Sequence, residues 1–202
     1  MKLYYSPGAC SLSPHIVLLE AGLAADHVKV DLASHKTADG ADYYTVNGKG
    51  YVPTLQLDDG TLLTEGPAIV QYLADQAPAS GLAPANGTLA RYQLQEWLNF
   101  ISAEIHRTLG ALFDRTLSED ARAAVVARIG KRFDWLAKRL EGKQYLTGNT
   151  FSVADAYLFT LLNWKDWLKI DLTKWPVLVA YHARVAARPN VQAALKAEGL
   201  VK

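Results

Sequence analysis

Short strand-like and helix-like segments alternate along the first 78 residues. Residues 2–5 (Lys-Leu-Tyr-Tyr) predict a strand that ends at the following Ser-Pro-Gly. A helix is expected next, with Ser11 or Ser13 as its N-cap and Gly22 at its end. Residues 27–32 then alternate polar and apolar side chains, which is typical of a half-buried strand. The opening unit is therefore predicted to be strand, helix, strand.

A predicted hairpin and a helix complete this half. Residues 54–57 and 61–63 are strand-like, and the Asp-Asp-Gly between them favours a tight type I′ turn. Gly66-Pro67 opens a helix that we expect to reach Asp75. Its buried face is predicted to contain Ile69, Val70, Tyr72 and Leu73. This order of elements, β-α-β followed by β-β-α, is the plan of a thioredoxin-like sheet.

Beyond residue 88 the pattern is that of long helices only. We expect them over residues 88–114, 118–141, 153–168, 176–187 and 191–197. Ser152 and Asp155 have the spacing of a capping box for the third of these helices. Prolines and glycines indicate a linker over 76–87. We therefore predict an α/β plus all-α chain, with a thioredoxin-like N-terminal domain (1–80) followed by an all-helical C-terminal domain (88–202).

Composition narrows the class of protein. The 21 basic and 20 acidic residues give a formal net charge of +1, which disfavours nucleic acid as a partner. No apolar run has the length of a membrane span, and the first residues lack the pattern of a signal peptide. A single cysteine excludes an internal disulfide and suits a reducing compartment. We therefore expect a cytoplasmic protein with no membrane and no nucleic-acid partner.

Cys10 falls between the first predicted strand and the first predicted helix. Free backbone N–H groups and the helix dipole stabilise an anion at such a position, which predicts a lowered thiol pKa. The alternative is that Cys10 is simply a small buried hydrophobic residue. Ser13 stands where dithiol oxidoreductases have a second cysteine, so any redox cycle through Cys10 requires an external thiol.

Two further motifs have the chemistry to bind a peptide with an amino-acid end. Val52-Pro53 opens the third predicted strand, where proline removes a ladder donor and leaves the Val52 backbone available to an extended peptide. Glu65 precedes a helix whose first amides, from Gly66 onward, are free; carboxylate and amides together suit an ammonium and a carboxylate. The simpler interpretations are a strand-start proline and a carboxylate that satisfies the helix dipole.

The first long helix offers a third candidate. Asn99, Ala103 and His106 recur at spacings of four and three residues and are predicted to share one face. A histidine on a helix is more often a surface or packing residue than a catalyst. The five histidines of the chain show no ligand-like pairing, so no metal site is predicted.

Several motifs then combine into one resemblance. They are residues 2–5, 7–12, 52–53, 63–66, 96–99, 151–157 and 188–191. Together they resemble a cytosolic glutathione transferase, most closely the bacterial beta class, over essentially the whole chain. The resemblance implies a homodimer with a glutathione site on the first domain that faces a hydrophobic substrate site on the second. Glutathione is then a co-substrate, and no tightly bound cofactor is implied.

The resemblance also implies roles by position. Cys10 would contact or covalently pair with the glutathione sulfur, and Val52 would bind the cysteinyl part. Glu65 and Gly66 would hold the γ-glutamyl end. The glycyl carboxylate would meet a basic residue, here His35 or Lys36. The remaining implied contacts are Pro53, Asn99, Ala103, Glu104 and His106 with glutathione, and Tyr5 and Trp164 with the hydrophobic substrate; Cys10 and His106 are the catalytic candidates.

Three departures from the family and three possible functions follow. His35 stands where lysine is common, and Gly66 lacks the hydroxyl that many classes have at that position. Asn47-Gly48 stands where Asn-Pro is usual, which predicts a looser loop before Val52. The leading hypothesis is attack by the glutathione thiolate on small hydrophobic electrophiles, with Tyr5 and Ser11 as candidate hydrogen-bond donors. The second is a glutathione-dependent disulfide reductase or peroxidase that acts through a Cys10 mixed disulfide. The third is a non-catalytic interaction protein.

Overall fold

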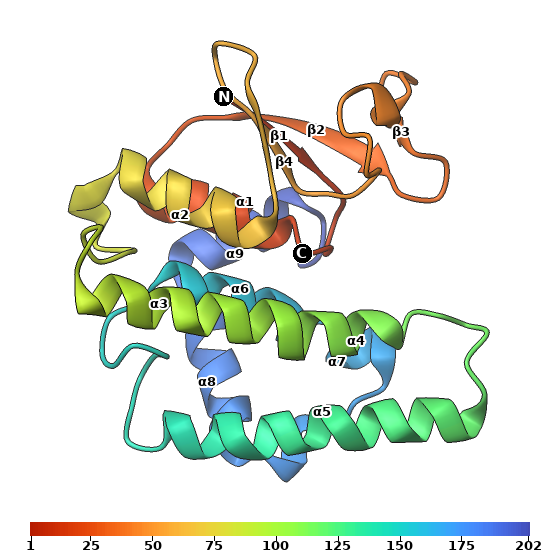
Figure 1. Cartoon of the computed structure of the whole chain (residues 1–202), viewed down its shortest axis with the longest axis vertical. Helices are drawn as coiled ribbons and strands as arrows, with labels where there is room; N and C mark the ends of the chain where they lie inside the picture. The colour runs from red at the N-terminus through yellow and green to blue at the C-terminus, as the bar shows by residue number, and fades with distance from the viewer.

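A five-stranded sheet forms the first half of the molecule. The computed structural model describes residues 1–202. The strands are β1 Lys2–Tyr5, β2 Asp26–Asp31, β3 Lys36–Thr37, β4 Thr54–Gln56 and β5 Leu62–Thr64. They lie in the order β3-β2-β1-β4-β5, with β1 parallel to β2 and antiparallel to β4 (Figure 1). The predicted thioredoxin-like plan is confirmed.

The hairpin between β4 and β5 has a different turn from the one predicted. The Gly60 N–H donates to the Leu57 carbonyl at 3.0 Å, and the Leu57 N–H donates to the Thr61 carbonyl at 2.8 Å. Gly60 has φ of +86°, but Asp59 is not in the left-handed region. A type I′ turn needs positive φ at both positions, so the connection is a type I turn followed by a left-handed glycine. The Asp-Gly pair therefore predicted the hairpin correctly and its turn type wrongly.

Helices cover one face of the sheet and form the rest of the chain. Their bounds are α1 Leu12–Ala21, α2 Gly66–Gln76, α3 Leu89–Phe100, α4 Arg107–Ala111, α5 Glu119–Leu140, α6 Val153–Leu162, α7 Lys165–Leu168, α8 Pro176–Ala186 and α9 Pro189–Ala197. Short 3₁₀ turns occupy Tyr43–Thr45, Pro78–Ser80 and Leu172–Lys174. None of the helices has both the length and the apolar character needed to cross a membrane.

Two of the predicted helices are interrupted. The helix expected over 88–114 ends at Ala111 and contains a π-helical segment, Ile101–His106, between α3 and α4. Within it the Arg107 N–H donates to the Ser102 carbonyl, five residues back. The helix expected over 153–168 breaks between α6 and α7, where the Trp164 indole donates to the Gly8 carbonyl at 2.9 Å. Both interruptions lie beside the cleft described below.

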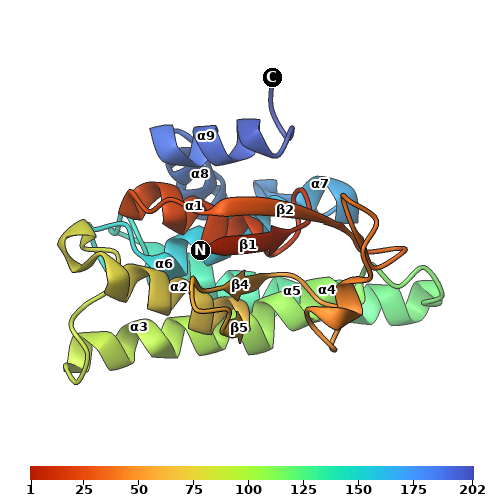
Figure 2. The same ribbon diagram turned by 90° about the horizontal axis from the view of Figure 1, so that it is seen from above.

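One hydrophobic core of 42 buried residues runs through both halves. Helix α1 packs against α2 and also against α6 and α9. Viewed from above, α9 and α3 lie on opposite sides with α1 and α6 between them (Figure 2). The buried Arg91 guanidinium makes two 2.8 Å contacts with Asp75, which joins α2 to α3 across the linker. The linker therefore connects two halves that share a single core.

A buried carboxylate fixes the start of α6. Oδ2 of Asp155 accepts the Ser152 N–H at 2.9 Å, which is the carboxylate half of the predicted capping box. Oδ1 accepts the Leu146 N–H and the Tyr181 hydroxyl, each at 2.9 Å. Burial raises the pKa of Asp155 in spite of these hydrogen bonds. This network ties α6 to the preceding loop and to α8.

Candidate active site

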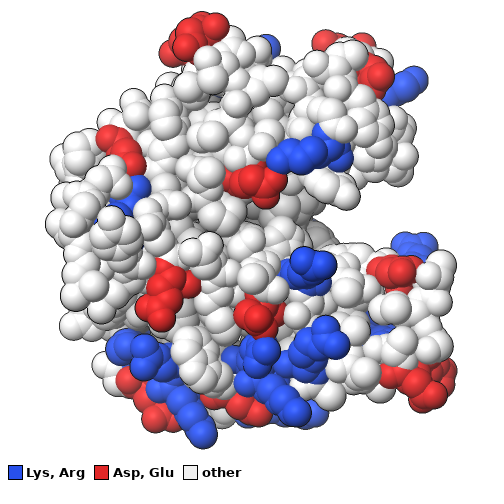
Figure 3. All heavy atoms as spheres, viewed as in Figure 1, with Lys and Arg blue, Asp and Glu red and all other residues white.

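A cleft of about 1130 Å³ lies between the sheet and the helical half. One wall is made by the β1–α1 loop, the segment before β4 and the β5–α2 turn. The other comes from the π-helical segment Ile101–His106, from α4 and from the region of α6 and α7. The space-filling view shows the cleft as a notch on the right-hand side of the molecule (Figure 3). It is by far the larger of the two main cavities, since the other has about 280 Å³.

The cleft gathers most of the predicted site residues. Its walls include Cys10, Val52, Pro53, Glu65, Gly66, Ala103, His106 and Trp164. Five predicted residues lie outside them: Tyr5, His35, Lys36, Asn99 and Glu104. No group of three or more His, Cys, Asp or Glu side chains is arranged to hold a metal ion.

Cys10 lies at the start of α1 with its thiol turned toward the segment before β4. Its Sγ donates to the Val52 carbonyl oxygen at 3.1 Å, and the Val52–Pro53 peptide is cis. Burial raises the pKa of the Cys10 thiol to about 12, although nearby backbone N–H groups act in the opposite direction. The lowered pKa predicted from the helix start is therefore wrong, because loss of hydration outweighs the favourable dipole. Cys10 is a neutral thiol at physiological pH.

The two hydroxyl donors proposed from the sequence are used elsewhere. Ser11 is fully buried, and its Oγ accepts the Ser6 N–H at 3.1 Å and donates to the Ser6 carbonyl at 3.2 Å. The Tyr5 ring packs edge-on against His15 and His27, with ring centroids 6.2 and 5.8 Å apart. Ser11 therefore supports the loop before α1, and Tyr5 is not a wall of the cleft.

The loop that carries Cys10 is attached to the helical half at Gly8. The Gly8 N–H donates to Oε2 of Glu198 at 2.8 Å, and its carbonyl accepts the Trp164 indole. The other oxygen of Glu198 lies 2.9 Å from Nδ1 of His15. Gly8 has φ of +72°, and a Cβ atom there would lie 2.2 Å from the Trp167 ring. Only glycine fits at this position.

Glu65 stands at the N-cap of α2 with φ of +70°, in the left-handed region that side chains rarely adopt. Its carboxylate is 70% exposed and accepts a hydrogen bond from Lys49 Nζ. The same ammonium donates to Thr64 Oγ1 at 2.9 Å. The backbone thus turns the carboxylate toward the cleft beside the free first amides of α2. Lys49 also lines the cleft, and the sequence analysis missed it.

His35 and Lys36 are not brought into the cleft. His35 has φ of +51°, and its ring packs at a tilt against Tyr44 with centroids 4.6 Å apart. Its Nδ1 lies 3.2 Å from the Gly50 carbonyl oxygen. Lys36 is exposed in the short strand β3. The basic residues of the cleft are Lys49 and Arg107 instead.

Hydrogen bonds of a buried side chain hold the loop before Val52. Asn47 is buried, and its Nδ2 donates to the Tyr51 carbonyl at 2.8 Å and to Thr54 Oγ1 at 3.1 Å. Its Oδ1 accepts the Lys49 N–H at 3.1 Å. Asn47 therefore orders the backbone on both sides of Gly48, and the looser loop expected from Gly48 stays a prediction.

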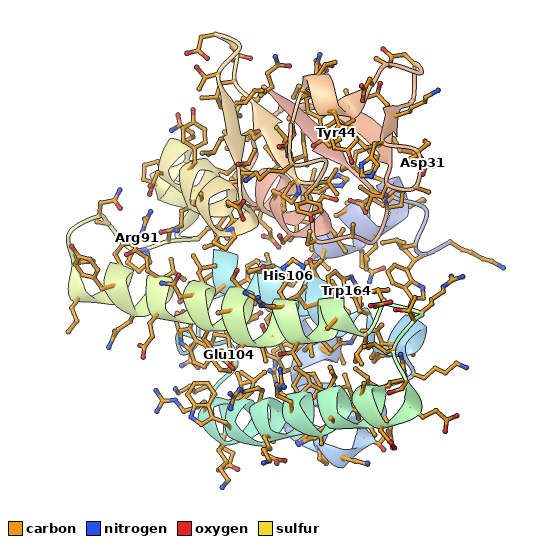
Figure 4. All side chains as sticks on the ribbon, turned by 45° about the vertical axis from the view of Figure 1, so that its right-hand side comes forward. Asp31, Tyr44, Arg91, Glu104, His106 and Trp164 are labelled. Carbon is orange, nitrogen blue, oxygen red and sulfur yellow. The ribbon has the colours of Figure 1, made fainter.

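His106 lies at the centre of the helical wall, as Figure 4 shows together with Trp164. Its Nδ1 is 2.6 Å from the Tyr157 hydroxyl, and its ring meets Trp164 edge-on with centroids 5.1 Å apart. Burial lowers the pKa of His106 to about 4 and raises that of Tyr157. At neutral pH the pair consists of an uncharged imidazole and an uncharged phenol, which can exchange hydrogen bonds with a bound ligand.

The predicted stripe on the first long helix is broken. Ala103 and His106 line the cleft, whereas Asn99 is exposed outside it. The π-helical segment has more residues per turn than an α-helix and rotates the residues before it away from the expected face. Glu104 is turned toward α5, where Arg132 Nε lies 2.6 Å from its carboxylate (Figure 4).

Sequence reasoning also missed part of the helical wall. The stripe through Ala103 and His106 continues along the cleft with Arg107, Gly110 and Phe113, at helical spacing. That signal was present in the sequence. Tyr157 lies within a motif already noted, but its contact with His106 depends on tertiary packing. No local pattern indicates that Glu198 reaches Gly8, 190 positions away.

Comparisons with known proteins identify the family. The family model of the glutathione S-transferase N-terminal domain matches residues 8–76, and that of the C-terminal domain matches residues 96–189. Glutathione S-transferase GstA of Escherichia coli O157:H7 is 45% identical over 200 residues, which cover 99% of this chain and 100% of that protein.

Comparisons with solved structures point to the same family. A sphingomonad glutathione S-transferase complexed with glutathione is 51% identical, with a TM-score of 0.95 and 100% coverage of both chains. The chain therefore belongs to the glutathione S-transferase family. A bacterial beta class member from Sphingomonas chungbukensis is 50% identical, with a TM-score of 0.96 and 100% coverage of both chains. The predicted fold, transferase class and beta-class resemblance are confirmed.

Proposed function

We propose that the protein binds glutathione and directs its thiolate onto carbon electrophiles that have a hydrophobic part. The observation that carries this proposal is one cleft with two unlike walls. Cys10, the Val52 backbone and Glu65 form a polar wall, and His106 and Trp164 stand on the aromatic wall opposite. The sphingomonad relative was solved complexed with glutathione, and the E. coli relative is a glutathione S-transferase by name.

The polar wall suits an extended tripeptide. The γ-glutamyl ammonium would pair with Glu65, and its carboxylate would meet the Gly66 amide at the start of α2. The cysteinyl backbone would pair with Val52, which places the sulfur beside Cys10. Since the ligand ammonium replaces that of Lys49 on Glu65, Lys49 becomes free to pair with a glutathione carboxylate. Lys49 thus takes the role of carboxylate partner that the resemblance gave to His35 or Lys36.

The reacting sulfur in this proposal belongs to glutathione. Its thiolate attacks the electrophilic carbon, a C–S bond forms, and the leaving group departs with the electron pair of the broken bond. The neutral His106–Tyr157 pair can donate a hydrogen bond to that thiolate without a proton transfer, and so can Cys10 if its S–H turns away from the Val52 carbonyl. The raised pKa of Cys10 disfavours the rival mechanism, in which Cys10 itself is the attacking thiolate.

Two measurements test the proposal. A titration of thiolate absorbance with glutathione bound should show a pKa below that of free glutathione. Steady-state conjugation of 1-chloro-2,4-dinitrobenzene should saturate with glutathione concentration. A protein that is not retained on glutathione resin and shows no conjugation would instead support the non-catalytic interaction protein.

We also propose that the enzyme is a homodimer through the outer face of α3 and α5. Trp97, Phe100 and Trp135 cluster there, with ring centroids 4.6 to 6.1 Å apart, and Trp135 is 43% exposed. Exposed aromatic clusters favour protein interfaces. In Figure 3 basic side chains gather on the lower part of this face, over α5, whereas acidic ones are spread over the whole face. Sedimentation of W135R should give the monomer mass.

Two further expectations belong to this proposal. We take residues 1–80 as the glutathione-binding domain and residues 88–202 as the domain that contributes the hydrophobic site. The lone cysteine, partly buried and unpaired, suits a reducing compartment, so we place the enzyme in the cytoplasm.

A further inference from the structure

Arg107 is the one cation of the cleft without a charged partner. Lys49 pairs with Glu65, which is the only carboxylate on the walls. His106 is uncharged because burial lowers its pKa to about 4. Arg107 is exposed and makes no side-chain hydrogen bond or ion pair. The cleft therefore has a single uncompensated positive charge, and it stands on the helical wall.

The surroundings of Arg107 are aromatic. Arg107 begins α4, directly after His106, and Gly110 and Phe113 follow on the same side of the helix. The Phe113 and Trp164 rings meet edge-on with centroids 5.2 Å apart, and Trp164 meets His106 in the same way. These rings form a continuous aromatic surface on the same wall of the cleft as Arg107.

Gly110 leaves space between the cation and the rings. A Cβ atom built at Gly110 meets nothing within 4 Å, so the space one helical turn beyond Arg107 is open. A flat ring can lie over Gly110 against Phe113 and Trp164. A substituent on that ring would then point along the helix toward the guanidinium.

We infer that the electrophile is an aromatic or similarly flat molecule that carries a carboxylate, and that Arg107 receives this group. The inference rests on the proposed transferase function and specifies its second substrate. A guanidinium binds a carboxylate through two parallel N–H···O bonds and so fixes orientation as well as affinity. A bound ring that covers the pair on one side would strengthen it relative to a pair in open water.

A matched pair of substrates tests this assignment. 4-Chloro-3,5-dinitrobenzoate and its methyl ester both react with a thiolate at C4. In each case the C–S bond forms, the C–Cl bond breaks, and chloride leaves with the bonding electrons. The readout is the preference ratio, which is kcat/KM for the acid divided by kcat/KM for the ester, each corrected for its uncatalysed rate. The ratio cancels effects on folding and on glutathione binding.

Arg107→Gln should lower the preference ratio about fivefold to tenfold, mainly through KM for the acid. Arg107→Lys should retain part of it, because the charge remains but the two parallel bonds are lost. Arg115→Gln, an exposed arginine outside the cleft, should leave it unchanged. Higher ionic strength should lower the wild-type ratio and affect the Arg107→Gln ratio much less.

Three outcomes would overturn the inference or its foundation. An unchanged ratio in Arg107→Gln would mean that Arg107 does not receive the carboxylate. A rise in KM for glutathione of the same size with both electrophiles would assign Arg107 to glutathione and also overturn the inference. No turnover of either substrate by the wild-type enzyme would instead overturn the proposed transferase function.

Discussion

The two walls of the cleft differ in how the chain builds them. The sheet wall consists of short local segments, in which Cys10, Val52 and Glu65 each stand at a strand end or a helix start. The helical wall consists of pairs from distant segments: His106 meets Tyr157, 51 positions away. Turn chemistry therefore places the polar wall, whereas packing of the whole core places the aromatic wall. Substitutions that weaken packing in the core should therefore disturb the helical wall before the sheet wall.

The largest effect is expected from Asp155→Ala. Asp155 fixes the start of α6, and its removal leaves the N–H groups of Leu146 and Ser152 buried without a partner. The free energy of unfolding should fall by about 3 kcal/mol. Urea denaturation measures it, with Glu96→Ala as an exposed carboxylate control. Equal losses in the two variants would show that the Asp155 network does not stabilise α6.

Gly8→Ala should have the next largest effect and tests the attachment between the walls. Gly22→Ala is its matched control, because both glycines have similar positive φ, +72° and +67°, but only Gly8 faces a ring at 2.2 Å. Gly22→Ala should destabilise by about 1 kcal/mol for the backbone alone. Gly8→Ala should destabilise by about 1 kcal/mol more and raise KM for glutathione; urea denaturation measures the first effect and steady-state kinetics the second. Equal behaviour of the two variants would contradict the contact with Trp167.

The pH dependence of stability tests the burial of two histidines in the helical half. Burial lowers the pKa of His106 and His182 in the helical half to about 4, whereas unfolded histidine titrates near about 6.5. Between these two pKa values the unfolded chain binds more protons than the folded chain. The free energy of unfolding therefore falls as the pH falls from about 6.5 toward 4, and the full contribution of both histidines is present above that range. Thermal unfolding across this range should show the loss. His182→Gln should reduce it, and an identical pH profile in that variant would contradict burial as its cause.

The smallest effect on conjugation is expected from Cys10→Ala. Because burial holds the Cys10 thiol neutral, its loss removes one hydrogen bond and should lower kcat/KM about threefold to tenfold. Reduction of a glutathione mixed disulfide, if the enzyme has that activity, should disappear entirely. Loss of conjugation by several orders of magnitude would mean that Cys10 itself is the nucleophile.

The sequence predicted the sheet wall well because its signals are local. Strand ends, the Val-Pro pair and the Gly-Pro helix start each place a residue through its neighbours, and Val52 and Glu65 were found in this way. The errors on this half concern positions as well as energies: His35 and Lys36 were expected at the ligand but lie outside the cleft, and Lys49 was missed. A helix start suggested a low pKa for Cys10, but the extent of its burial depends on contacts that no motif specifies.

The helical wall was predicted less well because its signals are not local. An unbroken helix was assumed through Asn99 and His106, and a single π-helical segment between them changed which residues face the cleft. Glu104 was expected at the ligand but pairs with Arg132. Trp167 and Glu198 act on the Cys10 loop from the far end of the chain, which only the folded structure reveals.

The single core shared by both halves has a consequence for the history of the chain. Helix α1 of the sheet half packs directly on α6 and α9 of the other half, so each half covers apolar surface of the other. A recombination event that exchanged one half for that of a distant relative would replace only one side of this contact. Viable exchanges therefore require the facing surfaces of α1, α6 and α9 to be inherited together, and the substrate-binding helices diversify within that constraint.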